Sequence, residues 1–169
     1  MTYVENISDK EVQGSAKDLF VGMTEKSGKV PEWMRVMAHC DDTLMAFFSL
    51  FKTLMDDSPA DPKLKWKIAH HVSELNKCKY CASVSINMLK KFGVPEEDIK
   101  NIEEASNEKE LLALEFASQM TLTPYDIDKD IRERMKDDFS DAEIVEIASV
   151  VGLFNYINRF NDAMQVVEG

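Results

Sequence analysis

The chain has 169 residues, of which 44% are hydrophobic and 30% are charged, and its formal net charge at pH 7 is -11. This length suits a single core, so we expect residues 1–169 to form one domain. An acidic surface repels phosphate backbones, which argues against nucleic-acid binding, and no apolar run approaches the ~20 residues that span a bilayer. The first residues lack the basic start and apolar block of a signal peptide, so a cytoplasmic location is expected.

Helical periodicity dominates the chain, and no stretch alternates convincingly as a strand does. Ser8 followed by Glu11 predicts a capping box that opens the first helix, and Ser140 followed by Glu143 predicts another that opens the last. The predicted helices cover about 8–26, then from Asp41 or Asp42 to 55, 62–75, 78–92, 96–105, 108–120 and 144–167, with a short apolar segment at 33–38 and a charged helix that opens at Thr123. The sequence therefore predicts an all-α fold of about seven to nine helices.

The last predicted helix is apolar on nearly every side over residues 147–154. Such a helix must be covered by protein over most of its surface, so packing against another subunit is expected. Asn155, Asn158, Arg159 and Asp162 follow at helical spacing, and buried polar groups must be paired. Hydrogen bonding at a subunit interface is the favoured interpretation of these residues, and catalysis is the alternative.

Cys78 and Cys81 form a C-x-x-C pair at the expected start of a helix. Both sulfur atoms then lie in the first turn, where backbone N–H groups and the helix dipole stabilise a thiolate. Lys77 and Lys79 add positive charge nearby. A thiolate attacks peroxides and disulfides, and two sulfurs this close can form an internal disulfide, so the pair predicts redox chemistry. We expect the pKa of the Cys81 thiol to lie below the ordinary ~8.5.

Two other interpretations of the pair stay open, namely two small half-buried core residues or a zinc site. Zinc would need further ligands from His39, Cys40, His70 and His71, but the chain has neither a second C-x-x-C nor an H-x-x-x-H motif. No metal and no cofactor are therefore expected. Cys40 is expected to be buried and structural, together with His39. Of His70 and His71, one is expected to be buried and hydrogen-bonded and the other exposed.

Four segments of the chain resemble alkylhydroperoxidase-D-like (AhpD-like) proteins, which belong to the carboxymuconolactone decarboxylase superfamily. These segments are 62–68 (PKLKWKI), 72–81 (VSELNKCKYC), 92–97 (FGVPEE) and 154–163 (FNYINRFNDA). The resemblance is tight over about residues 60–98 and looser elsewhere. It implies an all-helical subunit that assembles as a homo-trimer or homo-hexamer, with the thiols near a pocket lined by subunits. It also implies peroxidase or disulfide-reductase activity, in which Cys81 attacks a small peroxide or disulfide. Cys78, nearer the surface, then resolves and is re-reduced by a dithiol protein.

The chain departs from this family at the positions of the proton relay. The family has a histidine four residues after the second cysteine, where this chain has Ser85, and often a glutamate twelve residues before the first, where it has Trp66. Alkylhydroperoxidase D itself also has a histidine directly before the second cysteine, where this chain has Tyr80. Ser85 donates a hydrogen bond but is no base near neutral pH, so weak peroxidase activity is expected.

The predicted catalytic residues are Cys81, Cys78, Glu74, Ser85, Tyr80 and His71. His71, Glu74 and Cys78 would share one helical face, but residues 76–77 are expected to break that helix. Glu74 is the best substitute acid or base, and a solvated charge at a helix end is an equal alternative. Tyr80 could orient a peroxide.

Three functions are compatible with the sequence. The first and favoured one is a thiol–disulfide oxidoreductase of the AhpD-like type. The second is a lactone decarboxylase, taken from the superfamily name, for which no convincing acid–base constellation is present. The third is a non-catalytic oligomeric module that binds or senses redox state, in which the cysteines only lock a conformation.

Overall fold

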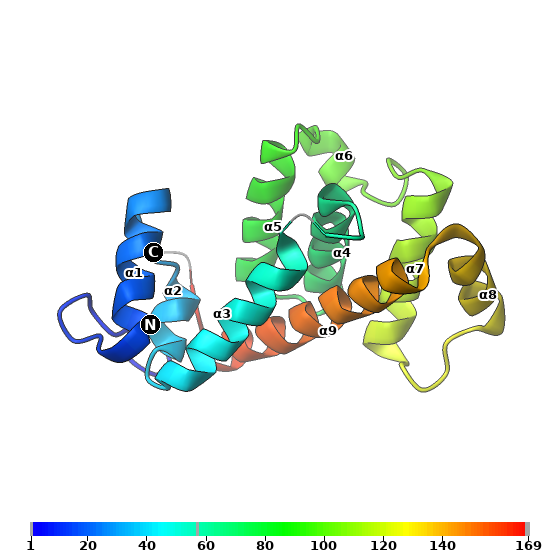
Figure 1. The fold of residues 1–169 in the computed structure, drawn as a ribbon. Coiled ribbons are helices and arrows are strands. Elements are labelled where there is room, and N and C mark those ends of the chain that lie inside the picture. Colours follow the sequence, from blue (N-terminus) through cyan, green and yellow to red (C-terminus); the bar gives the residue numbers. More distant parts are fainter. Residues whose placement is uncertain (1, 57, 168–169) are drawn as a thin grey trace. The chain divides into compact units, whose positions relative to one another are not determined.

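The computed structural model describes residues 2–56 and 58–167, and this part of the chain consists of helices joined by turns and irregular segments, with no strand. Its helices are Gly14–Ser27 (α1), Glu32–Met37 (α2), Asp41–Met55 (α3), Pro62–Leu75 (α4), Lys79–Lys91 (α5), Glu96–Lys100 (α6), Glu108–Leu122 (α7), Lys129–Asp138 (α8) and Asp141–Ala163 (α9) (Figure 1). The prediction of an all-α fold with seven to nine helices is confirmed. None of the helices in these two described stretches is both long and apolar enough to cross a bilayer.

The chain divides into two compact units. Of the described residues, one unit comprises 2–53 together with 160–167, and the other comprises 54–56 and 58–159. The C-x-x-C pair and the residues that surround it belong to the second unit, which is therefore described in more detail.

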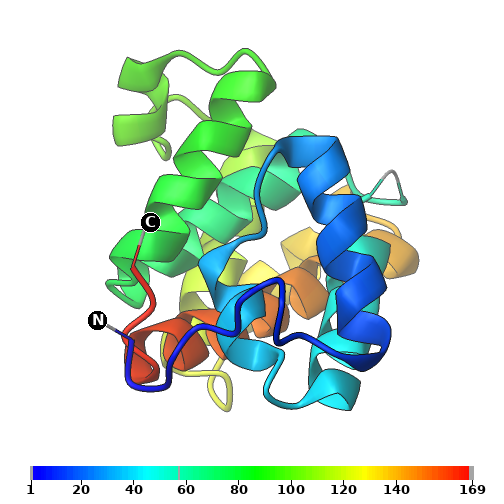
Figure 2. The same ribbon diagram turned by 90° about the vertical axis from the view of Figure 1, so that its left-hand side faces the viewer.

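Helix α4 is the central element of the second unit. It packs against α5 on one side and α7 on another, while α6 follows α5 and α8 packs against α7. Figures 1 and 2 show α5 and α6 together at one end of this group. Because α4 has protein on several sides, all of its residues from Leu64 to Ser73 are buried, including polar ones. Side chains on α4 therefore meet partners from α5 and α7 rather than water.

The first helix begins six residues later than Ser8, so its predicted start is wrong. Ser8 does make the expected side-chain hydrogen bonds with Glu11, at 2.6 and 3.1 Å, but they close only a single turn. The start of α1 is instead capped by Asp41, whose carboxylate accepts hydrogen bonds from the backbone N–H groups of Ser15 (3.2 Å) and Ala16 (2.7 Å). A cap supplied by a distant residue leaves no local signal in the sequence.

Three other helix boundaries bear on the sequence prediction. Helix α6 ends at Lys100 rather than near 105, and α8 begins at Lys129 rather than at Thr123. The second capping box is confirmed, because Ser140 and Glu143 exchange three hydrogen bonds of 2.8 to 3.3 Å at the start of α9.

The apolar stretch of α9 is covered by the chain itself. Ile147, Val150 and Val151 are fully buried in the single chain, and Leu153 and Phe154 are 4% exposed. The single chain therefore buries most of residues 147–154 without a second subunit, and packing of this helix against another subunit stays a prediction.

Candidate functional site

The turn between α4 and α5 places the two cysteines. Helix α4 ends at Leu75, and Lys77 takes a left-handed conformation with φ 61°. The N–H groups of Lys77 and Cys78 then donate to the carbonyls of Glu74 and Ser73, both at 3.0 Å. This is a Schellman motif, which reverses the chain within two residues. The predicted break at residues 76–77 is thus confirmed, and Glu74 and Cys78 do not share one helical face.

Two asparagines of α9 hold this turn from the other side. Asn158 is fully buried and donates from Nδ2 to the hydroxyl of Ser73 at 3.1 Å. The side-chain amide of Asn76 donates to the Oδ1 atoms of Asn155 (3.1 Å) and Asn158 (3.0 Å). Asn155 and Asn158 therefore make these hydrogen bonds within the chain, and not at a subunit interface as expected. Their effect is to fix the segment that leads into Cys78.

The cysteines lie at the start of α5 as predicted. Cys78 is the N-cap residue and Cys81 is the third residue of the helix. Both are buried, with Cys78 0% and Cys81 4% exposed in the single chain, so the expectation that Cys78 lies nearer the surface is wrong. The physical reason is that Cys78 sits in the tight turn between two packed helices. Tyr80, in the same turn of α5, is half-buried.

Ser85 contacts His70, a histidine that is not among the predicted catalytic residues. Ser85 is fully buried, and its hydroxyl donates to the carbonyl of Ala82 at 2.8 Å. The same oxygen lies 3.1 Å from Nδ1 of His70, which reaches across from α4. The buried residues of α5 include Cys81, Ala82, Ser85 and Leu89, so Ser85 lies one turn beyond Cys81 on the face that packs inward.

His70 and His71 are both buried, 5% and 6% exposed, so the expectation that one of them is exposed is wrong. Consecutive helical residues point about 100° apart, so His70 meets α5 while His71 meets α7. The Nε2 atom of His71 lies 2.6 Å from the Ser118 hydroxyl, and its Nδ1 lies 3.7 Å from the Glu103 carboxylate. These contacts give His71 a role in joining α4 to α7 and to the segment after α6.

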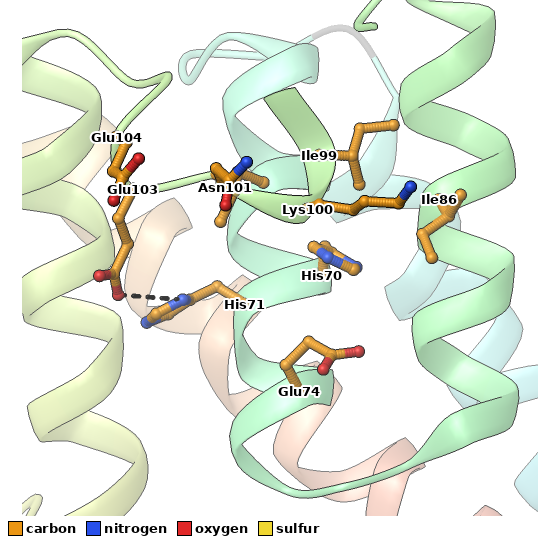
Figure 3. A pocket seen from close by; sticks show the side chains of 10 residues that line it. His70, His71, Glu74, Ile86, Ile99, Lys100, Asn101, Glu103 and Glu104 are labelled. Atoms are coloured by element: carbon orange, nitrogen blue, oxygen red, sulfur yellow. Dashed lines mark ion pairs between the residues drawn. The ribbon is translucent and has the colours of Figure 1, made fainter. Parts of the chain in front are cut away.

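A pocket of about 520 Å³ opens beside the two histidines. Figure 3 shows His70, His71 and Glu74 on α4, with Ile86 of α5 on the opposite side. Glu74 is exposed, and together with His70 it lines this pocket. Neither cysteine is among the lining residues. His70 therefore lies between the pocket and the Ser85 hydroxyl.

Burial lowers the pKa of both imidazoles. For His70, the loss of solvation is opposed by the Glu74 carboxylate and by backbone groups of Ala82 and Ile99, which raise the pKa less. For His71, desolvation again lowers the pKa most strongly, with Glu103 opposing it. Both rings are consequently neutral near pH 7 and able to accept a proton.

These lowered pKa values predict a loss of stability in mild acid. Below the ordinary histidine pKa of about 6.5 the unfolded chain takes up protons that the folded chain does not, so stability falls as pH decreases. The urea midpoint is expected to be lower at pH 5.5 than at pH 7.5. His70→Gln/His71→Gln should show a smaller difference between the two pH values, and an equal difference would contradict the assignment.

Two other sequence candidates, Cys40 and His39, belong to the first unit. Cys40 is exposed, contrary to expectation, and its Sγ lies 2.9 Å from the Thr43 hydroxyl. His39 is exposed too, with Nε2 2.7 Å from the Glu5 carbonyl. Within residues 2–56 and 58–167, no group of three or more His, Cys, Asp or Glu side chains is placed to hold a metal ion, so the zinc interpretation has no ligand set there.

Known proteins resemble both the sequence and the fold. Residues 41–106 match the carboxymuconolactone decarboxylase family. An uncharacterized protein of Escherichia coli, YnjA, is 25% identical over 114 residues, which are 64% of this chain and 63% of that protein. The chain thus spans less than two thirds of that relative's length.

Three solved structures share the fold over nearly the whole chain. An uncharacterized peroxidase-related protein of Silicibacter sp. is 26% identical, with a TM-score of 0.85, covering 99% of this chain and 88% of that one. A peroxidase-related protein of Ralstonia eutropha, described as an alkylhydroperoxidase AhpD core, is 19% identical, with a TM-score of 0.89 and coverage of 99% and 92%. The debrominase Bmp8, a cysteine-to-alanine variant bound to 2,3,4-tribromopyrrole, is 25% identical, with a TM-score of 0.83 and coverage of 97% and 90%. Residues 41–106 are thus similar to the carboxymuconolactone decarboxylase family, and the chain shares its fold with solved structures that include an alkylhydroperoxidase AhpD core.

Proposed function

We propose that the chain is a thiol–disulfide oxidoreductase that reduces small peroxides or disulfides. The observation that carries this proposal is the C-x-x-C pair in the first turn of α5, on a fold shared with peroxidase-related proteins. Cys81 is the attacking thiol and Cys78 the resolving one. Cys81 fits the first role because it lies on the same helical face as Ser85, the polar side chain that meets a histidine.

Reduction of a hydroperoxide requires only the sulfur atoms of the two cysteines and one external dithiol as the reductant. The Cys81 thiolate attacks the terminal oxygen of a hydroperoxide, the O–O bond breaks, and an alcohol leaves while Cys81 becomes a sulfenic acid. The Cys78 sulfur then attacks the Cys81 sulfur, releasing water and forming a disulfide. A dithiol reductant then reduces this disulfide by thiol–disulfide exchange. The reductant is oxidised to its own disulfide, and both cysteines return to thiols. Tyr80, in the same turn, is the candidate to orient the peroxide.

Burial of both cysteines favours small oxidants. A hydroperoxide can reach a thiol that is 4% exposed more readily than a folded protein can. Reduction by a dithiol protein then requires the turn at residues 76–78 to open locally, or a small dithiol to act in its place. The resemblance to AhpD-like proteins also leads us to propose a homo-trimer or homo-hexamer, which the mass in solution from light scattering tests.

The decisive test of this function is a stoichiometric thiol assay on the wild-type protein. We expect one equivalent of hydrogen peroxide or alkyl hydroperoxide to remove two titratable thiols per subunit, and dithiothreitol to restore them. Turnover should follow when the dithiol is supplied in excess. A thiol count that stays constant after oxidant would rule the proposal out. Reversible oxidation without turnover under any dithiol would favour the redox-sensing module instead.

A halogenated aromatic heterocycle is a second candidate substrate, because the debrominase Bmp8 resembles 97% of this chain at 25% identity. Cys78 and Cys81 would supply the two electrons that this reduction needs. The carbon–bromine bond is replaced by a carbon–hydrogen bond, hydrogen bromide is released, and the two thiols become one disulfide. Bromide release from 2,3,4-tribromopyrrole, measured beside peroxide consumption with the same dithiol, distinguishes the two substrates. Bromide release at a higher kcat/KM than peroxide consumption would favour dehalogenation.

A further inference from the structure

The resemblance leads us to expect a relay histidine on α5, but this chain has Ser85 at that position. The imidazole of His70 lies close to Ser85. Ser85 occupies the position where the family has its histidine, and Ser85 is in hydrogen-bond contact with His70 of α4, 3.1 Å away. His70 lies eight residues before Cys78, outside the family's pattern, and is not among the predicted catalytic residues. The fold therefore brings a base to the serine from the neighbouring helix.

Helix geometry places the Cys81 thiol on the same face as the serine that contacts His70. Cys81 and Ser85 are four residues apart on the buried face of α5, a spacing at which helical side chains are neighbours about 5–6 Å apart at Cβ. The Ser85 hydroxyl has one proton and two acceptor positions, and it can turn its proton toward the Ala82 carbonyl or toward Nδ1 of His70. When it faces His70, its oxygen is able to accept a proton from the thiol.

We propose that Ser85 and His70 form a two-residue relay that takes the proton from Cys81, with His70 of α4 supplying the imidazole that related proteins carry on the helix of the cysteines. This inference rests on the proposed thiol chemistry. In one step the Cys81 proton moves to Ser85 Oγ and the Ser85 hydroxyl proton moves to His70 Nδ1. The electrons of the S–H bond stay on sulfur, leaving a thiolate and an imidazolium. His70 acts through Ser85 and is a positioning residue.

Two opposing effects act on the charge of His70, and burial is the larger one. Burial keeps the ring neutral at rest, while Glu74 and the backbone groups of Ala82 and Ile99 favour the protonated form. His70 also lines the 520 Å³ pocket, through which the proton can leave. The charged and titratable groups that line the pocket together with His70 are Glu74 and His71 of α4, Lys100 of α6, and Glu103 and Glu104 of the segment after α6, and Cys81 is buried on the α5 helix that His70 contacts.

The test is the pH profile of Cys81 alkylation in the full chain. In a Cys40→Ser/Cys78→Ser background, Cys81 is the only thiol, and iodoacetamide labelling followed by mass spectrometry reports it alone. We expect His70→Gln and Ser85→Ala each to raise the midpoint of the profile by about one pH unit or more. The double variant should shift it no further than either single variant, because both break the same path.

The matched control is His71→Gln. His71 adjoins His70 on α4, is equally buried and lines the same pocket, but hydrogen-bonds Ser118 instead of Ser85. Its replacement should leave the alkylation midpoint in place, and so should Ser85→Thr, which keeps the hydroxyl. An equal shift in His71→Gln, or no shift in both His70→Gln and Ser85→Ala, overturns the relay.

Failure of the relay is distinguishable from failure of the function. If wild-type protein consumes peroxide while both relay variants keep the wild-type alkylation midpoint, the thiol function stands and the relay is wrong. If wild-type protein forms no disulfide, the proposed function fails, and the alkylation midpoints still decide whether His70 and Ser85 perturb Cys81. If His70→Gln or Ser85→Ala loses its helical circular dichroism, the other variant is used, because either substitution alone interrupts the proposed relay.

Discussion

Glu146→Ala is expected to destabilise the protein by about 3–5 kcal/mol, because it leaves a lysine charge buried without its counter-charge. Lys65 is fully buried, and its Nζ lies 2.6 Å from the Asp56 carbonyl, 2.6 Å from the Ser58 hydroxyl and 3.8 Å from the Glu146 carboxylate. Glu146 is nearly as buried and also accepts hydrogen bonds from the Ala60 N–H (2.6 Å) and from the Ser58 hydroxyl. The carboxylate is thus the charge partner of the ammonium and a cap for the segment before α4.

Urea unfolding at pH 7 measures this loss. The matched control is Glu133→Ala, which removes the exposed partner of Lys129 in α8 (82% and 63% exposed side chains) and should change stability by less than about 1 kcal/mol. Lys65→Met/Glu146→Leu removes both charges and should recover much of the loss. A Glu146→Ala loss no larger than the control would mean that water reaches the ammonium.

These lysines show where the sequence was uninformative about burial. Lys63, Lys65 and Lys67 alternate along the start of α4, and lysines are rarely buried, yet Lys65 is fully buried and Lys67 is 5% exposed. Lys67 donates to Glu110 (2.9 Å) and Ser106 (3.2 Å), which lie some forty residues away in sequence. Periodicity predicts which face of a helix is apolar, but a helix enclosed on several sides buries its polar residues too.

Local signals were sufficient for much of the fold. The bounds of α4 and the start of α5 follow from Pro62, from the break at residues 76–77 and from the C-x-x-C segment, and the structure agrees with them closely. The start of α1 could not be predicted in this way, because its cap is Asp41. Helix boundaries that depend on residues within four positions can be predicted from a sequence, whereas caps supplied by residues that tertiary packing brings close cannot.

The same contrast between local signals and tertiary contacts applies to the residues of the candidate site. Cys78, Cys81 and Ser85 were found because a motif and a helical spacing mark them. His70 was missed as a partner of Ser85 because the contact joins two helices across a turn. The available signal was the position of His70 four residues before Glu74, which places both on one face of α4 beside the pocket. That spacing shows that His70 and Glu74 share a face of α4, but it does not show which helix packs against this face.

Removal of each cysteine in turn should separate the two roles in catalysis. Cys81→Ser is expected to lower peroxide consumption at least about a thousandfold, because the sulfur that remains, that of Cys78, is fully buried and serves only to resolve. Cys78→Ser should still consume about one equivalent of peroxide per subunit and accumulate a sulfenic acid at Cys81 that dimedone traps. It should then fail to form an internal disulfide, so its steady-state rate falls while its first turnover persists.

Cys40→Ser is the control for both variants, since Cys40 is exposed, lies in the first unit and takes no part in the proposed chemistry. Stopped-flow peroxide consumption and dimedone labelling should match the wild-type protein. If Cys78→Ser lost the first turnover while Cys81→Ser kept it, the roles would be reversed. Full turnover of any superfamily substrate in Cys78→Ser/Cys81→Ser would instead point to acid–base chemistry. The thiol pair would then be a packing element between α4 and α5, as its burial alone would permit.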